Sequence, residues 1–376
     1  MEWLFFYYHV ILSLLSMKIS KKKLLIISCS GGMGHIRAAE ALQAHCKKFY
    51  PEITCQHFNA AEYSGWFLNA SLVKSYEFLI KKHPKVFGAL FKLADTAVGK
   101  KYIELHTPLL RRSGEPLIDA IARFKPDRII VTHPIVMPLL EKLPSAPPID
   151  VVVTDYYANK MWLHPDIRHL FVATSEMKEE LANEHSSVIV SGIPLQPVFF
   201  EDKDINKLKK LWKIKPNLPT LLLLSGGEGL VDISTTTKHL LKENSNLNII
   251  TIAGKNAALY TKLTSLSPHT NNYQALTFTQ KIDELMRIAD IIITKPGGLT
   301  VAECLYLKKP LITINPIPGQ EEANESYITT HKFGIAATTN TEVLQAVREL
   351  LAGNIALSLV PDLPNPNSKI IESGIS

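Results

Sequence analysis

Short apolar runs, each followed by a glycine turn or a helical pattern, recur along most of this 376-residue chain. The run LLIIS at 24–28 opens one such unit, and LLLLS at 221–225 opens another in the second half. Further runs typical of buried strands lie at 128–133, 150–155, 170–175, 248–254, 290–295 and 310–315. A parallel βα unit begins with an apolar strand that leads directly into a glycine turn. The pattern therefore predicts an α/β fold with open, doubly wound sheets.

The chain is long enough for two domains, and the pattern is interrupted near its middle. The stretch GIPLQPVFFEDKD at 192–204 carries two prolines and then charged residues. We therefore predict two Rossmann-like domains that face each other across a cleft, at 17–195 and 205–355. The remainder, 356–376, is predicted to be a tail, with loop or disorder from Pro361 onward.

Composition narrows the class of protein. Apolar residues make up 46% of the chain and charged residues 20%, a balance typical of soluble globular proteins. The net charge of +6 fits an anionic ligand or membrane surface, but it is too small to indicate nucleic-acid binding. The four cysteines are scattered and form no Cys-x-x-Cys pair, which favours a reducing compartment such as the cytosol.

The first sixteen residues, MEWLFFYYHVILSLLS, are apolar but shorter than the ~20 residues that a membrane-spanning helix needs. Lysines follow at 18–23, where positive charge would keep the next residues on the cytoplasmic side. The segment is either a short N-terminal anchor or a start codon assigned too early, with Met17 as the first residue. The second interpretation is the simpler one.

The turn after the run at 290–295 is a candidate anion site. Gly297 and Gly298 allow a tight turn into a helix whose N-terminus presents unpaired N–H groups to a phosphate. Glu303, one turn into that helix, could accept hydrogen bonds from ribose hydroxyls. However, Thr300 and Glu303 also match a capping box, in which Glu303 only satisfies the helix start. These few residues leave both interpretations open.

A second polar turn follows the run at 310–315. It places amide and carboxylate side chains, which suit the hydroxyls of a sugar, at Gly319, Gln320, Glu321 and Asn324. A solvated helix cap has a similar composition. Successive strand ends of a parallel sheet face the same crevice, which favours a ligand site. A third turn would add backbone N–H groups for a diphosphate at Gly226 and Gly227.

The first half offers a candidate base. Gly32 and Gly34 keep the strand–helix turn open, and His35 stands at the start of the helix. A positive helix end lowers the pKa of a histidine and keeps it neutral, able to take a proton from an alcohol. Asp155, at the end of another predicted strand, could orient His35 or act as the base itself. A lone histidine is more often structural, and such an aspartate is more often a cap.

Between residues 59 and 101, aromatic and aliphatic residues are mixed with lysines. Amphipathic helices with basic faces can lie in a membrane interface, although ordinary core helices show similar patterns. From the pattern alone, core helices are the safer interpretation. The family resemblance given below favours a membrane contact, with the residues Trp66, Phe67, Lys81, Lys82 and Lys85.

The stretch TKPGGLTVAECLYLKKPLITINPIPGQEEANESYI, residues 294–328, closely resembles the donor-binding region of the diacylglycerol glycosyltransferases. That family includes monogalactosyldiacylglycerol synthases and processive diacylglycerol glucosyltransferases, and it is related to the enzyme that adds N-acetylglucosamine to lipid I. The loop SCSGGMGHIRAAEAL at 28–42 resembles the family's Gly-x-Gly-His loop. The resemblance implies a GT-B fold, a UDP-sugar donor, inversion at the anomeric carbon, a diacylglycerol acceptor, and no essential metal or other cofactor.

The resemblance also implies a role for each matching residue. Glu303 would hold the ribose, and Gln320 and Glu321 the sugar hydroxyls. Thr300 would contact the diphosphate together with the glycine turns. The residues that lie where the family packs backbone against uracil are Phe278 and Thr279.

Two positions depart from the family pattern. Asn159 stands where the glucosyltransferases carry a histidine, and Glu228 replaces part of a glycine-richer loop. The predicted function is transfer of a hexose from UDP-glucose or UDP-galactose to diacylglycerol, by a peripheral protein at the cytoplasmic face of a membrane. The alternatives are transfer of N-acetylglucosamine to an isoprenoid-linked acceptor, a nucleotide-sugar epimerase, and a catalytically silent UDP-sugar sensor. A dinucleotide dehydrogenase is disfavoured because no Gly-x-Gly-x-x-Gly follows either first strand.

Overall fold

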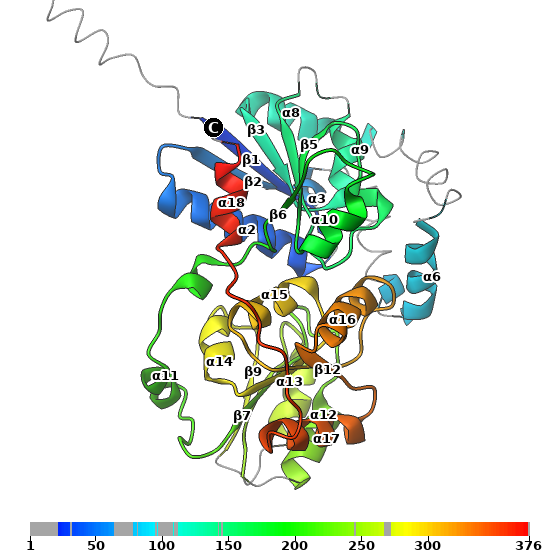
Figure 1. Ribbon diagram of the computed structural model, residues 1–376. Coiled ribbons are helices and arrows are strands. Elements are labelled where there is room, and N and C mark those ends of the chain that lie inside the picture. Colours follow the sequence, from blue (N-terminus) through cyan, green and yellow to red (C-terminus); the bar gives the residue numbers. More distant parts are fainter. Residues whose placement is uncertain are drawn as a thin grey trace, which may run out of the picture.

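The computed structural model describes residues 22–30, 32–63, 78–80, 82–94, 96, 108, 112–141, 143, 146–243, 246–266 and 272–374. These residues form two lobes, one above the other in Figure 1, each built on a six-stranded parallel sheet. The predicted apolar extension at 1–16 lies outside the described residues.

The first sheet has the strand order β2-β1-β3-β4-β5-β6. Its strands are β1 (Lys23–Ser28), β2 (Thr54–Asn59), β3 (Arg128–Val131), β4 (Ile149–Val152), β5 (Ile167–Val172) and β6 (Val188–Val190). The second sheet has the order β12-β11-β10-β7-β8-β9. Its strands are β7 (Thr220–Leu224), β8 (Asn248–Ile252), β9 (Tyr273–Leu276), β10 (Ile291–Thr294), β11 (Leu311–Thr313) and β12 (Gly334–Ala336).

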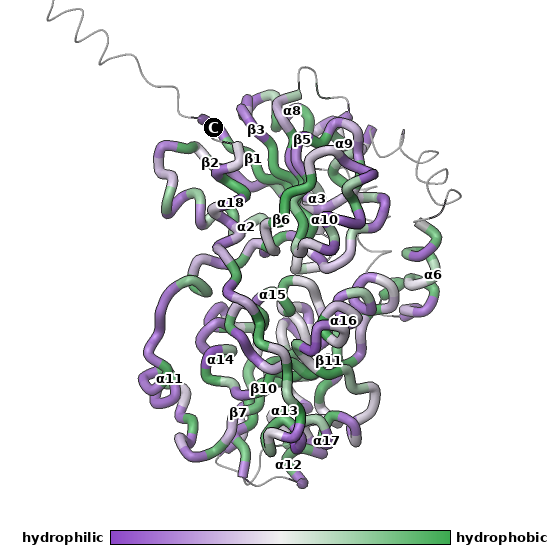
Figure 2. Tube along the Cα trace, viewed as in Figure 1, coloured by the Kyte–Doolittle hydropathy of each residue, from purple (hydrophilic) through white to green (hydrophobic). Residues whose placement is uncertain are grey.

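Helices cover both faces of each sheet, which explains why the central strands are apolar throughout. Every residue of β7, β8 and β10 is buried, and Figure 2 shows the central strands as hydrophobic stretches inside each lobe. The helices of the first lobe are α2 (Met33–Phe49), α3 (Ala60–Tyr63), α8 (Glu115–Phe124), α9 (Met137–Leu140) and α10 (Ser175–Leu181). Those of the second are α11 (Ile205–Leu211), α12 (Ser234–Glu243), α13 (Ala257–Thr264), α14 (Ile282–Ile288), α15 (Gly298–Tyr306), α16 (Gln320–Thr330) and α17 (Asn340–Leu351).

One further helix, α6 (Pro84–Ala94), lies beside α16 at the flank of the second lobe (Figure 1). Short 3-10 turns complete the chain at η2 (Pro134–Val136), η3 (Lys160–Trp162) and η4 (Pro197–Phe200). None of the described helices is both long enough and apolar enough to cross a bilayer.

The chain ends in α18 (Pro366–Glu372), which returns to the first lobe and packs against α2 (Figure 1). Ile370 and Ile371 of this helix are fully buried, and Arg128 donates hydrogen bonds to their carbonyl oxygens at 2.7 Å each. The prediction of loop or disorder from Pro361 onward was therefore wrong for this segment. A seven-residue helix with two apolar residues shows little periodicity, and its stability comes from tertiary packing.

Candidate active site

A cavity of about 400 Å³ lies between the two lobes. The first lobe contributes the turn after β1 and the residues that follow β4, whereas the second contributes the turns after β7 and β10 and the start of α16. Thus the carboxyl ends of strands from both sheets converge on one space, as they do at ligand sites of open α/β sheets.

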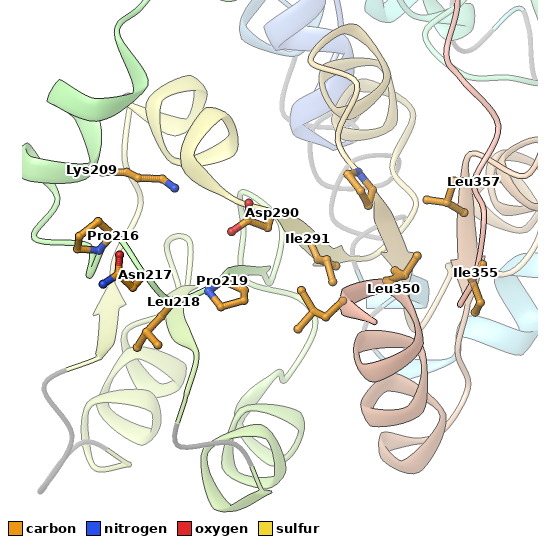
Figure 3. Close-up of a pocket in the computed structure, with 12 residues that line it drawn as sticks. Lys209, Pro216, Asn217, Leu218, Pro219, Asp290, Ile291, Leu350, Ile355 and Leu357 are labelled. Atoms are coloured by element: carbon orange, nitrogen blue, oxygen red, sulfur yellow. The ribbon is translucent and has the colours of Figure 1, made fainter. Parts of the chain in front are cut away.

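A second hollow, of about 550 Å³, lies at the opposite end of the second sheet (Figure 3). Its walls are largely proline, leucine and isoleucine residues, at the amino ends of β7, β10 and β11 and at or after the end of α17. Asp290 in this hollow accepts a hydrogen bond from the backbone N–H of Thr220 at 2.7 Å, so its carboxylate supports the sheet. We therefore place the active site in the cavity between the lobes.

His35 lies in the first turn of α2, is buried, and lines this cavity. Its Nδ1 lies 2.9 Å from the carbonyl oxygen of Thr132 and 2.8 Å from Oγ1 of Thr154. Because a carbonyl oxygen can only accept, the proton sits on Nδ1. In the neutral ring, Nε2 is then the atom left to accept a proton.

Burial keeps His35 neutral. It lowers the pKa of the imidazole below its ordinary value, and the charge of Asp155 and the hydrogen bond to Thr132 oppose this shift only in part. The predicted direction of the shift is confirmed, but burial is its largest cause. The ring of His133 packs edge-on at 4.4 Å between centroids, and burial lowers the pKa of His133 well below its usual range. A neutral neighbour adds no charge that would alter the protonation of His35.

Asp155 joins the two lobes. Its carboxylate accepts a hydrogen bond from Gln320 Nε2 at 2.6 Å and another from Asn324 Nδ2 at 3.0 Å, both from α16. Asn324 also donates to the carbonyl oxygen of Pro296 at 3.0 Å and accepts from the N–H of Tyr156 at 2.8 Å. The hydrogen bonds that orient His35 come from threonines, not from Asp155 as the sequence had suggested.

Asn324 was predicted to bind the donor, and it is not among the residues that line the cavity. The side chain is fully buried, and both its oxygen and its NH₂ group are hydrogen-bonded within the protein. Both N–H donors of the amide are therefore used within the protein, and its oxygen already accepts one hydrogen bond. Its place at the start of a polar helix could not be told apart from that of Gln320 by sequence alone.

Glu303 lies in α15, and the capping-box interpretation does not hold for it. The helix begins at Gly298 with Gly297 as its N-cap, so Thr300 is already inside the first turn. The Glu303 carboxylate lines the cavity, and burial raises its pKa to about 7. Arg37 from α2 lies 3.9 Å away, across the boundary between the lobes.

Gly298 stands where the two lobes touch. A Cβ atom at this position would lie 2.6 Å from Oδ1 of Asp155, closer than two such atoms can approach. Only glycine therefore lets the start of α15 meet the end of β4.

Three basic residues that the sequence motifs had not singled out also line the cavity: Arg37, Lys255 and Lys295. Lys295 forms an ion pair with Glu321, whose other oxygen accepts from the N–H of Ile317 at 2.9 Å. Each of these cations could offset the charge of a diphosphate. For Lys295 the sequence did hold a signal, because a lysine ended the predicted strand and stood directly before the glycine turn.

Comparison with known proteins decides the family. The sequence-family model for monogalactosyldiacylglycerol (MGDG) synthase matches residues 35–195. The family model for the glycosyltransferase family 28 C-terminal domain matches residues 221–354. The processive diacylglycerol beta-glucosyltransferase of Bacillus pumilus (strain SAFR-032) is 30% identical over 88% of this chain and 87% of the relative. The protein of the same name from Staphylococcus carnosus (strain TM300) is 29% identical over 91% of this chain and 88% of the relative. The chain belongs to the diacylglycerol glycosyltransferase family.

Solved structures support the fold of this diacylglycerol glycosyltransferase. Acinetobacter baumannii MurG aligns with a TM-score of 0.57 at 14% identity, over 94% of this chain and 99% of that one. The glycosyltransferase SnogD from Streptomyces nogalater aligns with a TM-score of 0.59 at 12% identity, over the same shares of the two chains. The predicted GT-B fold is confirmed; at these identities the likeness concerns the fold alone.

The two departures from the family pattern have structural explanations. The carboxylate of Glu228 pairs with Lys255 at 2.8 Å, so the acidic side chain at the mouth of the cavity is partly neutralised. Asn159 is buried and caps η3, where its side chain accepts from the N–H of Met161 at 3.2 Å. This member of the diacylglycerol glycosyltransferase family thus uses Asn159 for local structure.

The remaining predicted residues divide into two groups. Gly32, Gly34, Gly226 and Gly227 line the cavity together with Thr300, Gln320 and Glu321, while Gly319 is the N-cap of α16. Phe278 and Thr279, proposed for uracil, follow β9 at the edge of the sheet and do not line the described cavity.

Of the predicted membrane contact, Trp66, Phe67 and Lys81 lie outside the described residues. Lys82 and Lys85 are exposed. Within the described part of the chain, no cluster of His, Cys, Asp or Glu could hold a metal ion.

Proposed function

We propose that this diacylglycerol glycosyltransferase transfers glucose or galactose from a UDP-sugar to diacylglycerol, with inversion, at the surface of an anionic membrane. The observation that carries the proposal is the hydrogen bonding of the His35 ring, which fixes the nitrogen that holds its proton. Its Nδ1 donates to a carbonyl oxygen, so Nε2 is free to accept, and the residue lines a cavity whose other wall is the second lobe. The names of the relatives favour diacylglycerol as acceptor and glucose as the first sugar to test.

In the proposed reaction, the acceptor hydroxyl attacks the anomeric carbon while Nε2 of His35 takes its proton. The new C–O bond forms on the face opposite the bond to UDP, which breaks and leaves its electron pair on the diphosphate. General-base assistance of this kind contributes about 10²–10⁴-fold to a rate.

The second lobe would hold the donor and stabilise the departing UDP. Lys255 and Lys295 of this lobe supply positive charge together with Arg37 of the first lobe, and the N-terminus of α15 supplies unpaired N–H groups. Glu303 would accept hydrogen bonds from the ribose. Gln320 and Glu321 would contact the sugar, where Gln320 must exchange its bond to Asp155 for bonds to hydroxyls. Positioning and electrostatics would thus carry most of the catalysis.

Helix α6 supports action at a membrane surface. Val86, Leu90 and Leu93 are 49%, 49% and 42% exposed, at the three- and four-residue spacings that place side chains on one helix face. Lys85 and Lys92 are exposed on the same helix. An apolar stripe flanked by lysines suits the interface of a bilayer that contains anionic lipid.

The decisive experiment supplies the purified full-length protein with diacylglycerol liposomes and, separately, UDP-glucose, UDP-galactose and UDP-N-acetylglucosamine. Lipid products are separated by chromatography and identified by mass. We expect a hexosyl-diacylglycerol that disappears in His35→Ala and persists in His239→Ala, a control at an exposed histidine of α12.

Other outcomes would replace the proposal. Measurable UDP binding without a glycolipid from any donor would favour the silent sensor. Because diacylglycerol is the acceptor in every arm, a product from UDP-N-acetylglucosamine alone would replace glucose and galactose with N-acetylglucosamine as the transferred sugar.

A further inference from the structure

Helix α6 has a second face, which packs on the turn that precedes α16. A Cβ atom on Gly88 would lie 2.5 Å from Cβ of Pro318, and a Cβ atom on Gly319 would lie 2.7 Å from the ring of Phe91. Gly319 also has φ +91°, which favours glycine for a second reason. Two glycines, one on each side, thus allow helix and turn to touch closely.

The turn in contact with α6 belongs to the active site. It leads directly into Gln320 and Glu321, which line the cavity. The N–H of Ile317 donates to Glu321 at 2.9 Å and that of Gly319 donates to Glu322 at 3.0 Å. These local bonds tie the turn to the first residues of α16, so a shift of the turn would move the side chains proposed for the sugar.

The same helix therefore touches the donor side of the cavity with one face and exposes an apolar stripe with the other. Val86, Leu90 and Leu93 point away from the Gly88–Phe91 face, because residues two positions apart on a helix lie on opposite sides. Lys82 and Lys85 are exposed, and their charge makes an anionic lipid surface the fitting partner for the stripe; Lys92 lies 3.7 Å from the carboxylate of Glu322 in α16. Ile80, just before α6, also lines the cavity.

We propose that α6 couples the membrane to the donor site: lipid bound on its exposed face fixes the Pro318–Gly319 turn and so tightens donor binding. The inference rests on the proposed function for the identity of the donor, but not for the coupling itself. Linkage requires the effect to be reciprocal, so that donor also tightens membrane binding by the same factor.

The first test measures the turn directly, without donor. Hydrogen exchange of the backbone amides at 317–323 is compared between the wild type, Gly88→Val and Ala89→Val. Valine at 88 must push the helix off Pro318, whereas Ala89 is exposed on the same helix and gives the matched control. We expect faster exchange at 317–323 in Gly88→Val and in Phe91→Ala, which removes the ring from Gly319 without a clash. Wild-type exchange in both of these variants would overturn the proposal.

The second test adds vesicles of phosphatidylcholine, with or without phosphatidylglycerol, and no diacylglycerol. In the wild type, the anionic vesicles should slow exchange at 317–323 and lower the Kd for UDP-glucose by about five- to tenfold, within the usual range of coupling between sites. Leu90→Glu should lose both effects of the vesicles. Vesicle binding that leaves exchange at 317–323 unchanged would refute the coupling. A wild type whose turn responds to vesicles but which binds no UDP-sugar would support the coupling and refute the proposed donor.

Discussion

The two walls of the cavity, one from each lobe, differ in the chemical character of their side chains. On the first lobe, His35 is buried, neutral and fixed by Thr132 and Thr154. On the second lobe, basic side chains lie next to carboxylates, as in Lys295 with Glu321 and Lys255 with Glu228.

This difference fits the two halves of a transfer reaction. A base must offer one lone pair in one direction, which a rigid, desolvated ring provides. A charged donor must be bound and then released, and cations already held by carboxylates can exchange those partners for a diphosphate. Changes on the first wall should therefore alter turnover, and changes on the second wall should alter donor affinity.

The largest effect is expected on the first wall. Removal of the base in His35→Ala should lower kcat by about 10²–10⁴-fold while the Kd for the donor changes little. Added imidazole should restore part of the rate, since it can enter the space left by the ring. In the wild type, kcat should fall as the pH is lowered, with its midpoint below pH 6.5, because burial lowers the pKa of His35.

Rescue by imidazole should be specific to that wall. Glu303→Gln should bind donor more weakly and show no response to imidazole. A kcat of His35→Ala within threefold of the wild type would assign the proton transfer to another group.

The next largest effect concerns the contact between the walls. Asn324→Ala removes hydrogen bonds to Asp155, Pro296 and Tyr156, and leaves the buried Asp155 carboxylate with Gln320 as its remaining amide donor. A loss of about 2–4 kcal/mol in the free energy of unfolding is expected. Urea unfolding measures it, with Asn354→Ala as a control at an exposed asparagine. Equal stability of the two variants would show that Asn324 does not hold the lobes together.

Most strands followed from the sequence, and the strands that did not share one cause. The eight strands predicted from apolar runs are all present, whereas β2, β6, β9 and β12 were missed. These four are the edge strands of the two sheets. An edge strand has one neighbour and is half covered, as in β9, where only Tyr273 is buried. Its sequence therefore lacks the continuous apolar run that marks a central strand.

For the site, motifs located the glycine turns, His35, Glu303 and Gln320 correctly at the cavity. Arg37 was missed because it lies within α2, and only the approach of the two lobes brings it near Glu303. Lys255 was missed because it follows β8, and the pairing of β8 with β7 brings it beside the Gly226–Gly227 turn. For Asn324, the sequence could not show its hydrogen-bond partners. It lies beside the right motif, but its partners Asp155 and Tyr156 are more than 160 positions away in the chain.

A smaller effect is expected from the protonation of Glu303. Burial raises the pKa of this carboxyl to about 7, so it is mostly neutral at pH 6 and mostly ionised at pH 8. An ionised acceptor binds ribose hydroxyls more strongly, so affinity for the donor should rise with pH by about three- to tenfold. Burial shifts the pKa of His35 in the opposite direction, below its ordinary value, so the two groups respond differently to pH.

Calorimetry with UDP-glucose at pH 6, 7 and 8 measures this change. The sugar nucleotide is preferable to UDP, whose terminal phosphate titrates near pH 6. Glu303→Gln should bind more weakly at pH 8 and show a flat profile. The same slope in wild type and variant would place the titrating group elsewhere.

The smallest effect is expected at the mouth of the cavity, where Glu228 competes with the donor for Lys255. Both side chains are exposed enough for solvent to screen the pair, at 39% and 50% respectively, and such pairs are worth about 0.2–1 kcal/mol. In Glu228→Gln, Lys255 is released from the carboxylate and one negative charge near the diphosphate disappears. Affinity for UDP-glucose should therefore rise by up to about fivefold, and the gain should shrink at high salt.

The matched control for this change is Glu243→Gln, which removes an exposed carboxylate paired with Arg348 away from the cavity. Both variants lose the same charge, so a general electrostatic effect would appear in both and a local one only in Glu228→Gln. Weaker binding in Glu228→Gln would mean that the carboxylate itself contacts the donor. The second wall would then bind its ligand partly through an acidic group specific to this chain, and not through exchange of its cations alone.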